Sequence, residues 1–259
     1  MSHYLVWVTN TDVDSLEAQL APFNEQGDED DFYMQKEYIV KNDKESVEAY
    51  IKPQIKDCED SLKANDLKDE VRDYWKRRKK AFENILKLKT TKAQLERIQE
   101  WEGGRINKIG LYYLCNPEAR WDWWSVGGRW EGWLKTKDGK SVNSCQLKDI
   151  DFDKIREEEI KNMLKARKQE LEYAKQYNRE PMMWGFDKFP TEEEIKNQYK
   201  KPLSPYAILH EGDWISKGDM GWFGMSNDKY TDEDWDKYFY DFIGQLPGDT
   251  EITIVDCHI

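Results

Sequence analysis

The residues best suited to bind a ligand lie in one aromatic segment, residues 116–133, which contains five of the 12 tryptophans in the chain. The Gly127-Gly128 pair divides this segment into two alternating aromatic runs, a pattern typical of a β-hairpin with a type I′ turn. If the two runs pair across that turn, one face is mixed and carries Asp122, Trp124, Arg129, Glu131 and Trp133. The other face is apolar, and we expect it to pack into the core through Trp121, Trp123, Trp130 and Leu134.

The mixed face of this predicted hairpin has the residue types of a binding platform. A flat group such as a nucleobase could stack on Trp124 or Trp133, while the guanidinium of Arg129 binds a phosphate or a carboxylate. The alternative is a second core, in which Arg129 pairs with Asp122 or Glu131 and stacks on tryptophan. The sequence leaves both interpretations open.

A second glycine-rich aromatic segment, residues 212–225, supplies one further candidate for ligand binding, Trp222. The spacing of Gly218, Gly221 and Gly224 invites comparison with a dinucleotide-binding motif, but aromatic residues are interleaved with these glycines. That motif needs its glycine turn between a strand and the N-terminus of a helix. We therefore expect a turn or loop that lines a pocket.

The chain has three histidines, and two of them lie in the strand-like runs at its two ends, His3 and His258. They would meet if those strands were neighbours, and Asp256 would share a strand face with His258. His3, Asp256 and His258 could then bind a metal or supply a general base. The alternative is that these histidines are simply hydrogen-bonded, since their spacing matches no known ligand signature.

The elements that must position these residues are strands at both ends of the chain with helices between them. Residues 3–9 and 251–259 alternate in polarity and are rich in β-branched side chains, so we predict that both are strands of one sheet. Helices are expected at residues 153–177, 191–199 and 231–242, and further strands at 108–114, 121–134, 141–147 and 206–209. The pattern predicts an α+β fold with a mixed or antiparallel sheet that contains both terminal strands.

A long helical block interrupts this pattern between residues 44 and 101. Two apolar stripes at helical spacing predict two antiparallel helices with a turn at residues 64–66. We interpret the block as a helical hairpin inserted into one α+β core domain, which comprises residues 1–43 and 102–259.

Charge is unevenly distributed along the chain, whose formal net charge is -12. Residues 68–100 carry 11 basic and 6 acidic side chains, a local net charge of +5. The cluster of Arg77, Arg78 and Lys79 is therefore a candidate surface for an acidic protein partner, and the alternative is a solvated helix face. The overall negative charge argues against direct DNA binding.

Composition indicates a soluble protein of a reducing compartment. The mean hydropathy is -0.97, and no run approaches the roughly 20 apolar residues that a membrane span needs. The four cysteines are scattered without a CxxC pair, and no secretory signal is visible. We therefore expect free thiols, a cytoplasmic location and no membrane partner. We expect neither a cofactor nor a metal for the leading hypothesis below, and homo-oligomerisation stays open.

Three sequence motifs carry a resemblance to a known family: the segment from Asn116 to Trp130 (NPxAxWDWWxxGGRW), the loop from Gly218 to Gly224 (GxMGWxG), and the ending TIVDCHI. Together with the start Met1-Ser2-His3-Tyr4 and residues 20–25, they resemble a family of uncharacterised proteins from bacteriophages and bacterial genomes. The resemblance implies a viral or mobile-element protein that acts in the cytoplasm of a bacterial host.

These patterns favour a non-enzymatic binding protein that inhibits host antiviral defence. It would sequester a small nucleotide-like ligand on the aromatic face, or bind a bacterial defence protein through its basic helix. The alternative hypothesis is a metal-assisted hydrolase that acts on a nucleotide or nucleic acid and uses His3, Asp256 and His258. A DNA mimic is disfavoured, because every long helix mixes charges of both signs.

Overall fold

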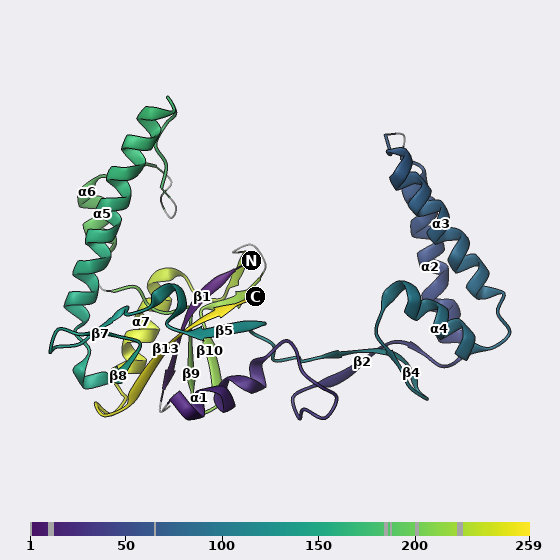
Figure 1. Cartoon of the computed structure of the whole chain (residues 1–259), viewed down its shortest axis with the longest axis horizontal. Coiled ribbons are helices and arrows are strands. Elements are labelled where there is room, and N and C mark those ends of the chain that lie inside the picture. The colour runs from purple at the N-terminus through teal and green to yellow at the C-terminus, as the bar shows by residue number, and fades with distance from the viewer. Residues whose placement is uncertain are drawn as a thin grey trace. The chain divides into compact units, whose positions relative to one another are not determined.

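The computed structural model describes residues 2–9, 13–64, 66–183, 186, 188–199, 202–221 and 225–259. The chain forms two compact units that both contain helices and strands (Figure 1). The first unit comprises residues 1–24 and 120–259, and the second is inserted between them as residues 25–119. The predicted α+β class is confirmed. The inserted unit extends beyond the helical block at residues 44–101, because three strands accompany its helices.

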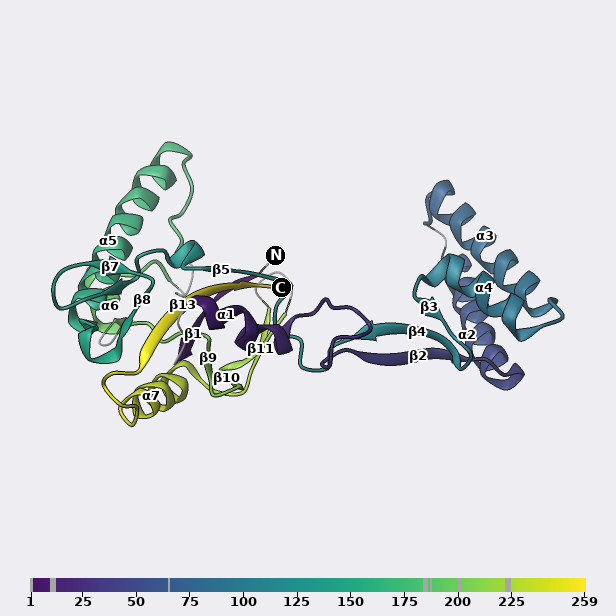
Figure 2. The same ribbon diagram turned by 60° about the horizontal axis from the view of Figure 1, so that its bottom comes forward.

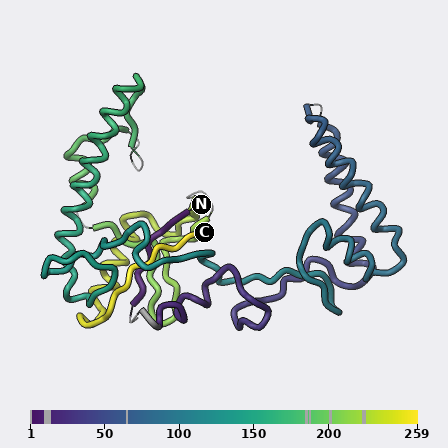
Figure 3. The backbone as a smooth tube through the Cα atoms, in the orientation of Figure 1, coloured from purple at the N-terminus to yellow at the C-terminus, as the bar shows by residue number. Residues whose placement is uncertain are grey.

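The first unit is built on one mixed sheet with the strand order β10-β9-β1-β13-β5, and β8 also pairs with β13. The strands are β1 (His3–Thr9), β5 (Trp123–Val126), β8 (Ser144–Gln146), β9 (Ala207–His210), β10 (Asp213–Ser216) and β13 (Glu251–His258). Among the described strands of this sheet, β1 and β9 pair in parallel and the other pairs are antiparallel. β1 and β13 lie side by side in the backbone trace (Figure 3), so the prediction that both terminal strands share one sheet is confirmed.

Alternation along β1 separates two hydrophobic cores, one on each face of the sheet. Val6 and Val8 belong to the core that also holds Leu16 and Leu20 of helix α1 (Val13–Leu20). Leu5 and Trp7 belong to the other core, to which the helices α5 (Phe152–Gln176) and α7 (Asp232–Ile243) contribute. His3 shares the face of Leu5 and Trp7, at the end of the strand where this second core stops.

The rest of the first unit consists of helices and short strands around this sheet. The helices are α5 (Phe152–Gln176), α6 (Glu192–Gln198) and α7 (Asp232–Ile243), and the short 3₁₀ helices are η1 (Ala21–Phe23), η2 (Gly128–Trp130) and η3 (Leu147–Asp149). Two small hairpins pair β6 (Leu134–Lys135) with β7 (Ser141–Val142) and β11 (Gly218–Met220) with β12 (Ser226–Asp228). Thr191 and Glu194 form a capping box at the start of α6.

The predicted hairpin around Gly127-Gly128 is wrong. β5 pairs with β13 instead of with the following residues, which turn into the 3₁₀ helix η2. Both glycines have positive φ, but Gly127 has a ψ of -64°, far from the left-handed conformation that a type I′ turn requires. The predicted division of the tryptophans between two hairpin faces fails with it.

The inserted unit packs three helices against a three-stranded antiparallel sheet. Its helices are α2 (Lys44–Leu62), α3 (Asp69–Leu86) and α4 (Thr91–Glu102), and its strands are β2 (Gln35–Lys41), β3 (Arg105–Ile106) and β4 (Gly110–Cys115). The helices gather into one bundle (Figure 2) around Val47, Ile51, Phe82 and Leu95. The second apolar stripe of the sequence is divided between α3 and α4, because the Thr90 side chain caps a new helix by accepting a hydrogen bond from the Ala93 N–H.

The structure also bears on the cysteines and on the expected absence of a membrane span. The four cysteines are free thiols. Within the described ranges, no helix combines the length and the apolar composition that crossing a membrane demands.

Candidate functional site

The register of the two central strands brings the two terminal histidines together. His3 of β1 lies directly opposite His258 of β13 in the antiparallel pairing. Their imidazole rings are 4.8 Å apart between centroids and meet edge to face, at 71°. The predicted approach of His3 and His258, with Asp256 on the same strand face, therefore corresponds to the observed geometry.

Each histidine has its own carboxylate partner. His3 Nδ1 lies 2.9 Å from Asp256 Oδ1, and His258 Nδ1 lies 2.5 Å from Asp122 Oδ1. Because an ionised carboxylate only accepts hydrogen bonds, each Nδ1 carries the hydrogen and each Nε2 is the free ring nitrogen. Neither Nε2 atom has a hydrogen-bond partner among the described residues. The result is two adjacent histidine–aspartate pairs, and the sequence predicted only one of the two aspartates for this group.

Asp256 is the most buried polar residue of this group, at 1% exposure. A buried carboxylate is costly unless hydrogen bonds compensate it. His3 binds one of its oxygens, and the Arg129 backbone N–H donates to the other at 2.9 Å. Gly128 makes this second bond accessible, because a Cβ at that position would lie 2.5 Å from Asp256 Oδ2. The Gly-Gly sequence therefore allows the chain to fold tightly over a buried carboxylate.

Trp123 forms an exposed aromatic surface beside the histidines. It pairs with His258 in the register of β5 with β13, and its ring centroid lies 6.2 Å from that of His3. The sequence assigned Trp123 to the core, but 51% of the residue is exposed. An indole this exposed beside two imidazoles offers a stacking surface to a planar group.

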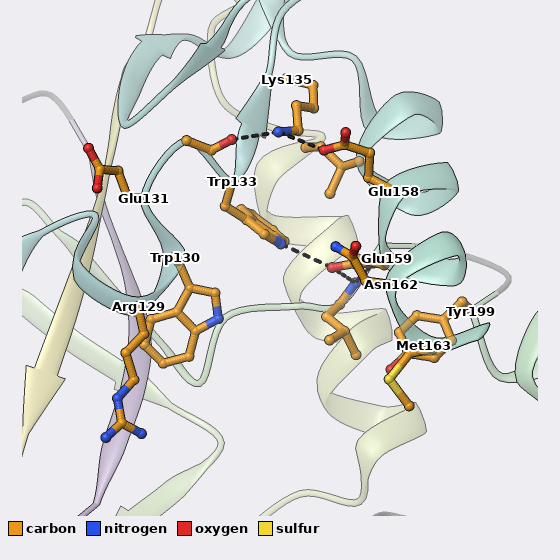
Figure 4. A pocket seen from close by; sticks show the side chains of 13 residues that line it. Arg129, Trp130, Glu131, Trp133, Lys135, Glu158, Glu159, Asn162, Met163 and Tyr199 are labelled. Carbon is orange, nitrogen blue, oxygen red and sulfur yellow. Dashed lines mark hydrogen bonds and ion pairs between the residues drawn. The ribbon is translucent and has the colours of Figure 1, made fainter. Parts of the chain in front are cut away.

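A cavity of about 420 Å³ is lined in part by the loop that carries Arg129 (Figure 4). Its walls come from that loop, from α5 and from the segment that follows α6. Half of the lining is aromatic or apolar, and the lining residues are Arg129, Trp130, Glu131, Gly132, Trp133, Lys135, Ile155, Glu158, Glu159, Asn162, Met163, Tyr199 and Leu203.

Glu159 is the chemically unusual group in this cavity. Burial raises the pKa of its carboxyl to about 7, although the Leu203 N–H and the Trp133 indole N–H, which both donate to it, act in the opposite direction. The two bonds also fix the Trp133 side chain and the Leu203 backbone relative to α5. The neighbouring Glu158 differs, because an ion pair with Lys135 at 2.7 Å lowers its pKa.

The structure distributes the sequence-predicted ligand residues over several places. Arg129, Glu131 and Trp133 line the cavity, while Asp122 binds His258. Trp124 packs against the core on the opposite face of the sheet, since it alternates with the exposed Trp123. The single mixed face expected from a hairpin does not exist. Trp222 lies outside the described residues.

The predicted partner-binding residues are engaged within the inserted unit. Arg78 forms an ion pair with Glu102 at 2.9 Å and lies over the rings of Phe82 and Trp101. Lys79 pairs with Glu59 at 2.8 Å and with Glu83 at 3.6 Å, and Arg77 donates to the Asp73 carbonyl. These contacts join α3 to α2 and α4. The structure thus gives Arg78 and Lys79 a local packing role, and a partner for this surface remains a prediction.

No group of three or more histidine, cysteine, aspartate or glutamate side chains in the described part of the chain is arranged to hold a metal ion. Searches of protein-family models, of curated proteins and of solved structures find no match to this chain.

The close approach at Gly128 predicts a site-specific cost of adding one methyl group. We expect Gly128→Ala to lower the free energy of unfolding by about 2 kcal/mol, since the new Cβ would displace Asp256. Gly212→Ala is the matched control, because Gly212 also has positive φ but has nothing within 4 Å of the added Cβ. Urea unfolding measures both values. Equal losses in the two variants would show that the contact with Asp256 is unimportant.

The raised pKa of Glu159 predicts how stability depends on pH. Between pH 4.5 and pH 7 the folded chain keeps a proton on this carboxyl that the unfolded chain releases, so the free energy of unfolding falls as pH rises. In the wild type this carboxyl should lower the free energy of unfolding by about 2 kcal/mol between pH 4.5 and pH 7, and Glu159→Gln should abolish that decrease. Urea unfolding at several pH values measures it. Glu158→Gln should leave this decrease in place, because the pKa of Glu158 is lowered. Parallel pH curves for wild type and Glu159→Gln would refute the assignment.

Proposed function

We propose that the chain is a hydrolase that cleaves a phosphate ester of a nucleotide, with the His3–Asp256 and His258–Asp122 pairs as its proton-transfer groups. The observation that carries this proposal is the cross-strand pairing of His3 with His258, which places the two imidazole rings 4.8 Å apart between centroids, each held by an aspartate through Nδ1. Two imidazoles in this arrangement supply both proton transfers that hydrolysis of an ester requires.

In the proposed reaction one neutral imidazole accepts a proton from the attacking water. The water oxygen bonds to phosphorus as the bond to the leaving oxygen breaks, and the second, protonated imidazole donates its proton to that leaving oxygen. The carboxylate behind each ring fixes the tautomer and stabilises the protonated form, as the aspartate of a catalytic triad does for its histidine. Both proton transfers use side chains of this chain, so the proposed mechanism needs no metal ion.

Two observations support a nucleotide as the substrate class. The exposed Trp123 ring beside His3 suits a stacked base, a contact worth about 1–3 kcal/mol per base. The net charge of -12 opposes the approach of a long polyanion. A single nucleotide or a short oligonucleotide satisfies both conditions better than duplex DNA does.

A nucleotide binder without catalysis is the second candidate, favoured by the cavity that Arg129, Glu131 and Trp133 line. In the phage context implied by the sequence motifs, either protein would inhibit antiviral defence in the host cytoplasm by removing a nucleotide signal. The hydrolase would destroy that signal, and the binder would sequester it. Inhibition through a bacterial defence protein bound at Arg77, Arg78 and Lys79 is a separate proposal, and charge reversal at Arg77 tests it without breaking the ion pairs of Arg78 and Lys79.

The hydrolase proposal predicts the effect of removing one imidazole at a time. Asparagine retains a donor near the Nδ1 position but has no counterpart of Nε2, so His3→Asn and His258→Asn preserve the bond to each aspartate. We expect each variant to lower kcat at least about 100-fold on nucleotides and short oligonucleotides. Chromatography of the reaction products measures the turnover. EDTA should leave turnover unchanged.

His210→Asn is the matched control for both variants. His210 hydrogen-bonds Thr9 through Nδ1 at 2.7 Å and belongs to neither histidine–aspartate pair. This variant should retain wild-type turnover. Full activity in the His3→Asn, His258→Asn double variant, or no turnover of any nucleotide by the wild type, would contradict the proposal, and retained nucleotide binding in the second case would favour the binder.

A further inference from the structure

The cavity beside α5 has the size and the lining of a small-molecule site. Its volume of about 420 Å³ lies within the range of roughly 300–1,000 Å³ for such sites. Trp130, Trp133 and Tyr199 provide aromatic surfaces, and Asn162 and Glu159 provide polar atoms that can hydrogen-bond the edge of a heterocycle (Figure 4).

The walls of this cavity are held in place by hydrogen bonds and an ion pair. Trp133 donates to Glu159 at 3.1 Å, and Glu159 in turn accepts from the Leu203 backbone at 3.1 Å. Lys135 bridges Glu158 and the carbonyl of Gly132, at 2.7 Å each, and thereby ties α5 to the loop. A ligand would enter a site that is already formed, so little binding energy is lost to ordering.

Arg129 links the cavity to the histidine–aspartate pairs. Arg129 is one of the residues that line the cavity, and its guanidinium has no carboxylate partner among the described residues, whereas Lys135 is already paired. Its backbone N–H binds Asp256, the partner of His3. An anionic group bound by this guanidinium would lie on the loop whose backbone also binds Asp256.

We infer that the cavity is a second base-binding subsite, and that the substrate is a dinucleotide with one base on Trp123, the other in the cavity, and the linking phosphate near Arg129 and the histidines. The inference rests on the proposed function. A compound with two planar bases joined through phosphate uses both aromatic surfaces, whereas a mononucleotide uses only one of them.

The test compares the binding of adenylyl-(3′→5′)-adenosine and AMP by equilibrium dialysis, with the His3→Asn, His258→Asn protein so that no ligand is consumed. The dinucleotide should bind at least about tenfold more tightly than AMP, since stacking of a second base is worth about 1–3 kcal/mol. Asn162→Trp, which fills the cavity with an indole, should remove this advantage. Lys161→Trp is the matched control, because it adds the same side chain on the same helix at a position that does not line the cavity.

Equal affinities of the His3→Asn, His258→Asn protein for the dinucleotide and for AMP would overturn the inference. This result does not depend on any cavity variant. An Asn162→Trp protein that retains the full preference for the dinucleotide would overturn the inference as well. Turnover by the wild type is scored separately. A protein that hydrolyses mononucleotides but lacks this preference retains the proposed function and loses the second subsite, and a protein with the preference but no turnover is a dinucleotide binder.

Discussion

The antiparallel pairing of β1 with β13 is the constraint on which the site depends. Seven residue pairs fix the register, and His3 faces His258 only in that register. Because side chains alternate between the two faces, a slip of one residue would turn the buried apolar residues of β13 toward the wrong core and separate the two imidazoles. The burial of Leu5 and Trp7 on one face and of Val6 and Val8 on the other therefore also positions the histidines.

A second constraint follows from Asp256, a carboxylate buried at the centre of the group. It needs hydrogen-bond donors, and the loop after β5 delivers one from the Arg129 backbone because Gly128 permits close contact. The same loop then forms one wall of the cavity. The conformation of Gly128 therefore also determines where Arg129 lies relative to Asp256. Local backbone geometry at one pair of glycines thus connects the proton-transfer groups with the aromatic cavity.

The sequence predicts those parts of the fold that local pattern determines. Alternating β-branched residues identify β1 and β13, and the spacing of Thr191 and Glu194 identifies the start of α6. The bond between Asp122 and His258 does not follow from local pattern, since the two residues are 136 apart and the pairing of β5 with β13 brings them together. The sequence does not determine the turn at Gly127-Gly128, because its conformation depends on ψ and on the contact of Gly128 with the Asp256 carboxylate. The exposure of Trp123 does not follow from the sequence either, because alternation alone does not say which face of a strand is buried.

Nuclear magnetic resonance of the histidine side chains tests the central claim most directly, since the chain has only three histidines. The protein labelled with ¹⁵N in its imidazoles is titrated with a phosphorothioate dinucleotide that resists hydrolysis. The account predicts that the Nε2 resonances of His3 and His258 shift together with one affinity, while the resonances of His210 stay in place. A ligand that binds and shifts neither terminal histidine would contradict it.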